Sequence, residues 1–287
     1  MSDVITAAAI MGCLSLFFGI VLAVAYRYLR VEEDPRIDSV EGMLPGSNCG
    51  ACGQPGCRAF AERVVTGISQ PSGCTVSSPD GIAIIADFLG VDAGEQDRKV
   101  ARLHCAGGEG MVQKMAEYRG ITSCRAAALI NRGVRACAWG CLGLADCERS
   151  CTFDAITMNA ENLPAVDEDR CTGCNDCVEE CPLDLFTLEP ISHRLLVQCN
   201  SPLIGETARS ICTVACDACG RCALDAEPDV IEMVDGLPVI RQPEAGTAEA
   251  TWRCPTGAIV WLEGQQFDPP LVPGQREHTS PGMHLHG

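Results

Sequence analysis

Cysteine is the residue type with the clearest chemistry in this chain: 21 of the 287 residues are cysteines, and most stand in short repeated spacings. The most regular run is Cys171-x2-Cys174-x2-Cys177-x3-Cys181, with Pro182 directly after it. Bacterial ferredoxins use this spacing, in which three cysteines ligate one 4Fe-4S cluster and the fourth ligates a second cluster. The run therefore predicts a pair of redox centres.

A looser run precedes it, and together the two place eight thiols within 45 residues. Crosswise sharing of the fourth cysteine divides the eight thiols into two sets of four. The expected sets are Cys137, Cys141, Cys147 with Cys181, and Cys151 with Cys171, Cys174, Cys177. Zinc also takes four thiolates, but its sites usually show two separated Cys-x2-Cys pairs, so the spacing favours iron and sulfide over zinc.

A further four-cysteine motif lies nearer the N-terminus and has the spacing Cys49-x2-Cys52-x4-Cys57-x16-Cys74. Gly50 lies between the first two cysteines, and Gly53 and Gly56 between the next two, which lets the backbone curl so that amides can face a cluster. The apolar positions between the last two cysteines have helical spacing. We expect a 4Fe-4S site here, with zinc as the alternative.

The C-terminal part repeats the central part. The segment 236–240 repeats the strand pattern of 162–166, which indicates an internal duplication. One complete ligand set is retained, namely Cys216, Cys219, Cys222 and Cys254. The positions of the other set carry Ala226, Glu244, Thr247 and Ala250. Because four ligands are lost together, the copy is predicted to hold one cluster, and the crosswise grouping gains support.

The remaining cysteines have no motif. Cys105 and Cys124 are either a free buried pair, since cysteine often packs as a small apolar residue, or part of a further metal site. Cys199 and Cys212 flank an expected helix over 202–211 and stay unassigned. Cys13 lies inside an apolar stretch, where packing is its expected role.

That apolar stretch, residues 4–26, has no charged residue and is long enough to span a bilayer. Arg27 and Arg30 follow it, and by the positive-inside rule the rest of the chain is expected in the cytoplasm. A cleaved signal peptide is the alternative, but the stretch lacks a basic leader. Residues 31–46 are acidic and contain prolines, which predicts a tether. Helices are expected over 80–89 and, with Ser123 as the N-cap, through Ile130.

The formal net charge of −17 makes nucleic acid an unsuitable partner. Residues 98–135 depart from this balance, with eight basic side chains against two acidic ones. This segment is either a docking surface for an acidic partner or a solvated face. The chain shows no nucleotide-binding fingerprint and no paired nucleophile and base, so we expect electron transfer without a substrate site.

The expected fold class is α+β: one N-terminal transmembrane helix followed by small iron-sulfur domains, some of them of the bacterial-ferredoxin type. The domains are expected over 1–26 (anchor), 27–98 (four-cysteine domain), 99–136 (connecting helical segment), 137–195 (two-cluster ferredoxin-type domain), 196–268 (one-cluster unit) and 269–287 (disordered tail). The tail carries three histidines, for which disorder is a simpler interpretation than metal binding.

The order of anchor, four-cysteine motif and ferredoxin runs resembles the B subunit of the Rnf complex, the ion-translocating ferredoxin:NAD oxidoreductase. The likeness covers most of the chain and rests on Asn48-Cys49-Gly-Ala-Cys52-Gly-Gln-Pro-Gly-Cys57, Gly140-Cys141-Leu-Gly-Leu-Ala-Asp-Cys147 and Cys171-Thr-Gly-Cys174. Thr152, where proline usually follows the cysteine, and the stripped second site of the copy depart from the pattern.

The resemblance implies a translocase-type oxidoreductase subunit that relays electrons between ferredoxin and membrane or flavin subunits, which reduce NAD. Its partners would be those subunits and ferredoxin, its cofactors four 4Fe-4S clusters, and its location the inner membrane, single-pass, with the clusters on the cytoplasmic side. A polyferredoxin-like subunit of another membrane complex, such as a hydrogenase, is the first alternative. A zinc-stabilised, membrane-anchored interaction protein is the second.

Overall fold

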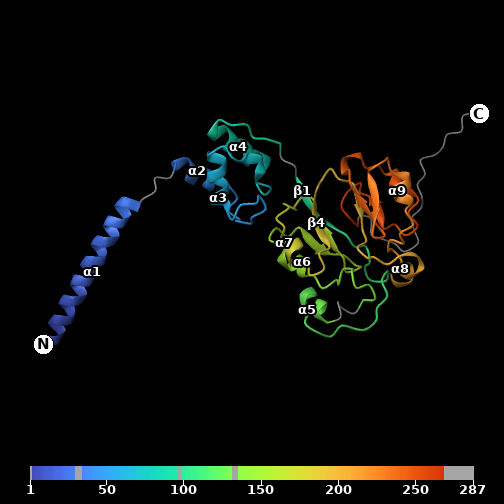
Figure 1. Cartoon of the computed structure of the whole chain (residues 1–287), viewed down its shortest axis with the longest axis horizontal. Helices are drawn as coiled ribbons and strands as arrows, with labels where there is room; N and C mark the ends of the chain where they lie inside the picture. Colours follow the sequence, from blue (N-terminus) through green and yellow to red (C-terminus); the bar gives the residue numbers. More distant parts are fainter. Residues whose placement is uncertain (1, 30–33, 96–97, 131–134, 268–287) are drawn as a thin grey trace, which may run out of the picture.

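The computed structural model describes residues 2–29, 34–95, 98–130 and 135–267. Its first element is helix α1 (Ser2–Leu29), which extends away from the other elements (Figure 1). Within it, Ile10–Tyr28 is apolar and long enough to cross a membrane, and none of that stretch is buried against the rest of the chain. The expected apolar helix is present. The C-terminal tail with its three histidines lies outside the described residues.

A compact helical unit follows. It contains α2 (Pro35–Met43), α3 (Cys57–Val65), the short helix η1 (Pro71–Gly73) and α4 (Pro79–Leu89). Val40, Val64 and Ile85 are almost fully buried between these helices. The prediction of a tether over 31–46 is therefore wrong for 35–43: Pro35 at the first helical turn and Asp34 as N-cap start a helix, and its apolar face packs on α3.

The predicted helix over 80–89 is α4, and its ends follow from local chemistry. The Ser78 hydroxyl caps the first turn by accepting a hydrogen bond from the Gly81 N–H, and Pro79 occupies the first position. Gly90 ends the helix in a left-handed conformation. The helix predicted between the third and fourth cysteines is α3.

The first ferredoxin-type unit begins earlier than expected. Strand β1 (Lys99–Leu103) pairs antiparallel with β4 (Phe186–Pro190). Between them come α6 (Asp146–Ser150), the hairpin of β2 (Ile156–Met158) and β3 (Pro164–Val166), and α7 (Asp176–Glu180). The expectation of a helical connection over 99–136 is corrected: this segment starts with a strand of the ferredoxin-type sheet, because Val100, Ala101 and Leu103 are needed in its core.

An insertion of residues 104–136 lies between β1 and the first cysteine loop. Its helix, α5 (Cys124–Leu129), is shorter than the predicted one by a residue, and Ser123 caps it as predicted, accepting from the Ala126 N–H at 3.4 Å. The rest of the described insertion is irregular.

The second unit repeats this plan. It contains β5 (Leu195–Val197), α8 (Gly205–Ile211), α9 (Arg221–Asp225), the hairpin of β6 (Ile231–Val234) and β7 (Leu237–Ile240), η2 (Pro243–Ala245), α10 (Glu249–Trp252) and β8 (Ile259–Trp261). β5 pairs with β8 as β1 pairs with β4. The two predicted repeat strands are β3 and β7, so the duplication extends to the first strand of each unit.

The two units are joined by backbone hydrogen bonds between the segments that follow their first strands. The Ala106 N–H donates to the Gln198 carbonyl at 3.0 Å, and the Gln113 N–H donates to the Ile211 carbonyl at 2.9 Å. In Figure 1 the orange and red strands of the second unit lie beside the green and yellow first unit. The irregular loops of both units therefore meet at one junction.

Candidate iron-sulfur sites

Cys49, Cys52, Cys57 and Cys74 line one cavity in the helical unit. Gly50 and Gly53 have left-handed backbone, each with φ of +74°, which curls the loop around that cavity. The Asn48 side chain accepts a hydrogen bond from the Cys57 N–H at 2.8 Å and closes the loop. These four thiols form a donor set suited to a 4Fe-4S cluster.

The crosswise grouping is visible in the central unit. Cys151, Cys171, Cys174 and Cys177 line one cavity, although Cys151 comes from the other cysteine run. The Cys151 sulfur accepts a hydrogen bond from the Ala155 N–H at 3.3 Å. Cys181 receives the equivalent bond from the Leu185 N–H at 3.5 Å. The two fourth cysteines therefore lie in matching turns.

In the second unit, Cys216, Cys219, Cys222 and Cys254 also line one cavity. This is the complete set expected there. Two positions of the lost set are packed instead: Ala250 is 1% exposed and lies in the same apolar cluster as Ala226. Glu244, at a third position, is exposed. The core of the unit therefore fills part of the space that a second set would use.

The three cysteine loops share a backbone register. Residues two and four positions after Cys141, Cys171 and Cys216 are all left-handed: Gly143 and Ala145, Gly173 and Asn175, Ala218 and Gly220. Left-handed backbone at a non-glycine residue is uncommon, so its repetition at Ala145, Asn175 and Ala218 marks one loop conformation used three times. Cys141 therefore stands at the first cysteine position of its loop, and Cys137 lies before the loop.

By this register, Leu144 stands where Cys174 and Cys219 stand in the other loops. Cys124, at the start of α5, occupies in space the position of the missing cysteine. The Asp146 N–H bonds to the Cys124 sulfur. The N–H groups of Asp176 and Arg221 bond in the same way to the sulfurs of Cys174 and Cys219. The Asp146 carboxylate holds α5 there by accepting from the Arg125 N–H at 3.0 Å.

The expected second set is therefore brought together only in part. Cys147 is close enough to Cys181 and Cys124 for their charges to interact, and Cys141 interacts with Cys147. Cys137 instead lines a cavity with Cys105, Cys199 and Cys212, and Cys141 borders that cavity as well. The correction has a physical reason. Between Cys141 and Cys147, Leu144 stands where the other loops have a cysteine, and the missing thiol is supplied by Cys124 of the insertion. Counting residues back from Cys147 is the sequence signal that could have revealed this.

Burial desolvates these thiolates and raises their pKa values. The pKa of Cys147 rises to about 12, first through burial and then through repulsion by Cys124, Cys177 and Cys181. Burial is also the main cause that raises the pKa of Cys177 to about 12 and that of Cys222 to about 11. Bound iron would supply the positive charge that such buried, mutually repelling thiolates lack.

The basic segment 98–135 is only in part an exposed charged face: Lys114, Arg119 and Arg125 are exposed, but other basic residues of the segment are not free. Arg102 is 2% exposed and paired with Glu168, and Arg135 is buried and donates to the Gly107 carbonyl at 2.7 Å. Arg98 donates to backbone carbonyls of the first unit. The segment therefore does not act as a whole as a docking surface for an acidic partner, because Arg98 and Arg102 bind to the first unit beside β1 and Arg135 is buried in the insertion.

Comparison with known families agrees with this geometry. A family model described as "Putative Fe-S cluster" matches residues 44–76, and a "4Fe-4S dicluster domain" matches residues 138–188. The dicluster match begins after Cys137, as the backbone register does. The chain is an iron-sulfur protein that contains ferredoxin-type units.

Its relatives define it further. It is 39% identical to the B subunit of the proton-translocating ferredoxin:NAD(+) oxidoreductase complex of Clostridium ljungdahlii, over 90% of this chain and 93% of that protein. It is 30% identical to the B subunit of the ion-translocating oxidoreductase complex of Methanosarcina acetivorans, over 90% and 98%. The B subunit of the Na(+)-translocating ferredoxin:NAD(+) oxidoreductase complex of Acetobacterium woodii is 39% identical over 75% of this chain, a match that spans 65% of that protein.

The chain therefore belongs to the family of B subunits of ion-translocating ferredoxin:NAD(+) oxidoreductase complexes. This confirms the resemblance inferred from the motifs. It also makes the chain an electron-transfer subunit of a translocase-type oxidoreductase with partner subunits, and together with α1 it indicates membrane association.

Proposed function

We propose that this subunit takes electrons from reduced ferredoxin and passes them, through clusters held by its own cysteines, to partner subunits that reduce NAD(+). The observation that carries the proposal is the near full-length relationship to the Clostridium ljungdahlii protein, whose name states this reaction. The cavities lined by four cysteines each supply the means. A 4Fe-4S cluster bound in such a cavity accepts and releases one electron at a time.

We propose four ligand sets, which the geometry supports. The first, third and fourth are those expected from the spacing, while Cys124 replaces Cys137 in the second. The sets are Cys49, Cys52, Cys57, Cys74; Cys124, Cys141, Cys147, Cys181; Cys151, Cys171, Cys174, Cys177; and Cys216, Cys219, Cys222, Cys254. The protein would hold each cluster with four thiolates and tune it by N–H bonds to sulfur and by burial.

The second and third sets are direct neighbours. The thiolate of Cys177, in the third set, is close enough to Cys147, in the second, to add by repulsion to the rise in pKa that burial causes there. Both cysteines belong to the same apolar core. An electron on one of these centres would therefore have a short path to the other.

We further propose that Ile10–Tyr28 anchors the chain as a single span and that the cysteine units lie in the cytoplasm. Support comes from the length and apolarity of this helix and from Arg27 in its last turn, which favours that side of the membrane. Ferredoxin, a soluble protein, would then reach the clusters directly.

The test uses inverted membrane vesicles that carry the whole complex. Reduced ferredoxin should drive NAD(+) reduction, and Cys174→Ala should abolish that rate because the third set loses a ligand. Cys13→Ala, a matched change of a cysteine within α1, should leave the rate unchanged. Full activity in Cys174→Ala would overturn the proposal, and so would bound zinc in place of iron in the purified wild-type chain.

A further inference from the structure

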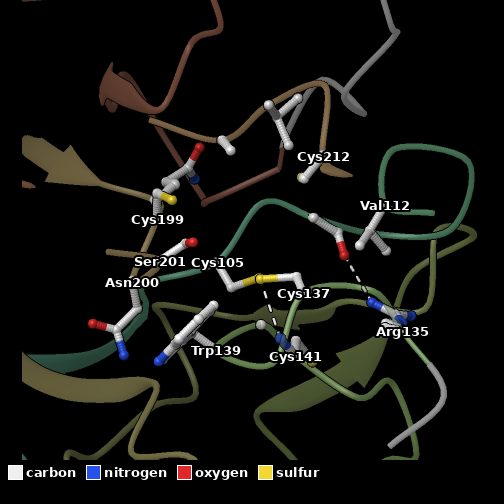
Figure 2. A pocket seen from close by; sticks show the side chains of 15 residues that line it. Cys105, Val112, Arg135, Cys137, Trp139, Cys141, Cys199, Asn200, Ser201 and Cys212 are labelled. Atoms are coloured by element: carbon white, nitrogen blue, oxygen red, sulfur yellow. Dashed lines mark hydrogen bonds between the residues drawn. The ribbon is translucent and has the colours of Figure 1, made fainter. Parts of the chain in front are cut away.

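Four cysteines without a motif meet at the junction of the two ferredoxin-type units. Cys105, Cys137, Cys199 and Cys212 line one cavity (Figure 2). We propose that these four thiols are the ligands of a fifth 4Fe-4S cluster.

The sulfur atoms converge on one space. Each of the six pairs among the four thiolates is close enough for electrostatic repulsion. Two glycines make room: a Cβ at Gly107 would lie 3.2 Å from the Cys212 Sγ, and a Cβ at Gly140 would lie 3.4 Å from the Cys137 Sγ and 3.5 Å from the Cys105 Sγ. Larger residues at either position would crowd the sulfurs.

Backbone N–H groups face these sulfurs as they face the ligands of the other sets. The N–H two residues further along bonds to the sulfur of Cys105, Cys137 and Cys212, through Gly107, Trp139 and Val214. The same arrangement holds at Cys52, Cys174, Cys216 and Cys219. In addition, the Cys141 N–H donates to the Cys105 Sγ at 3.3 Å. These donors stabilise thiolates more than thiols, as cluster ligation requires.

The duplication explains where the four ligands come from. Cys105 lies two residues after the end of β1, and Cys199 lies two residues after the end of β5. Cys137 precedes the first loop ligand, Cys141, by four positions, and Cys212 precedes Cys216 by four. Each unit therefore supplies an equivalent pair of thiols, and the site is complete only when both units are joined.

The cavity matches the other three in size. The space that protein atoms leave free is about 370 Å³ here and 310, 310 and 300 Å³ at three of the proposed cluster sites, each value including some open solvent. A fifth set also accounts for every cysteine outside α1. No three His, Cys, Asp or Glu side chains among the described residues converge closely enough for a single metal ion, so the proposal is for a cluster and not for zinc.

Arg135 adds a feature that the other cavities lack. Its buried guanidinium lines the cavity. Burial raises the pKa of Cys137, and the positive charge of Arg135 opposes part of that rise. Four thiolates carry more negative charge than the iron-sulfide core can offset, so a cation beside them compensates part of the excess.

The position of the site suggests its role, and this step rests on the proposed function. On one side, the Cys105 sulfur contacts the loop of the second set through the Cys141 N–H. On the other side, Cys199 repels Cys216 of the fourth set. A fifth centre would take one electron from a reduced neighbour and give it to the next oxidised one, with no bond or proton changed, and would connect the two units.

The experiment counts iron and acid-labile sulfide in the full chain, purified without oxygen in detergent. The wild type should contain about 20 irons per chain, five clusters of four. Cys199→Ala should lose about four of them, as should Cys219→Ala, which removes a ligand of the fourth set. Cys13→Ala should lose none.

The outcomes separate the two proposals. About 16 irons in both the wild type and Cys199→Ala, with a loss only in Cys219→Ala, would overturn the fifth site and leave the proposed function intact. One zinc per wild-type chain beside about 16 irons would overturn it too. A wild type without clusters would overturn both. If Cys199→Ala does not fold, the wild-type count still decides.

Discussion

The two ferredoxin-type units share one fold but differ in the cysteine sets that they carry. In the first unit, Cys177 is a buried member of the third set. Counting back from the last cysteine of each unit places Ala250 at the same position of the second unit. Ala226 and Ala250 pack with apolar neighbours where the first unit has ligands. A cluster site and an apolar core are therefore exchangeable solutions for the same space, provided that all four ligands change together.

The largest effect is expected from converting the first unit toward the second. Cys177→Ala removes a buried ligand without supplying the compensating packing of the second unit. About four irons should be lost, and because cluster binding contributes to folding, the thermal midpoint should fall sharply. Iron counting and circular dichroism melting measure both, with Cys13→Ala as the control. An unchanged melting curve would show that the cluster does not support the core.

A sharper test compares the three loops. Cys124→Ala should lose one cluster, about four irons, because Cys124 fills the ligand position that Leu144 leaves empty. Adding Leu144→Cys to that variant should restore the iron, since the register places this residue level with Cys174 and Cys219. Cys124→Ala with full iron content would contradict the assignment, and a failed rescue would contradict the register.

The smallest effect is expected in the packed region of the second unit. Ala250→Leu adds methyl groups to a position that is 1% exposed and should destabilise the chain by about 1–3 kcal/mol through overpacking. The iron content should not change, because no ligand is touched. Chemical denaturation measures the first effect, and loss of iron in this variant would mean that the region still contributes to a cluster.

Spacing within a loop carried most of the prediction. The sets around Cys49, Cys171 and Cys216 each surround one cavity, since three ligands a few residues apart must share a tight turn. The fourth ligand of the sets in the ferredoxin-type units was also predictable from the sequence, because the duplication shows which cysteines are retained and lost together.

Ligands supplied by the insertion could not be predicted in the same way. Cys124 is held in place by the Asp146 carboxylate, which accepts hydrogen bonds from Ser123 and Arg125 at the start of α5. The sequence spacing of these residues does not show that they meet in the fold. The first strands were missed for a related reason: Lys99–Leu103 is short, and its partner strand lies more than 80 residues away. Local patterns do not report such pairings.

The pairing of β1 with β4 has a consequence for the order of biogenesis. Lys99 faces Pro190 in this sheet, so the first unit cannot close until the chain has been synthesised beyond that residue. Until then its cysteines stand on an open chain, accessible to whatever delivers iron and sulfide. The fifth site waits longer, because Cys212 is made later, and the fourth set waits longest, because it needs Cys254. We therefore expect the helical unit near the membrane to mature first and the fourth set of the second unit to be completed last.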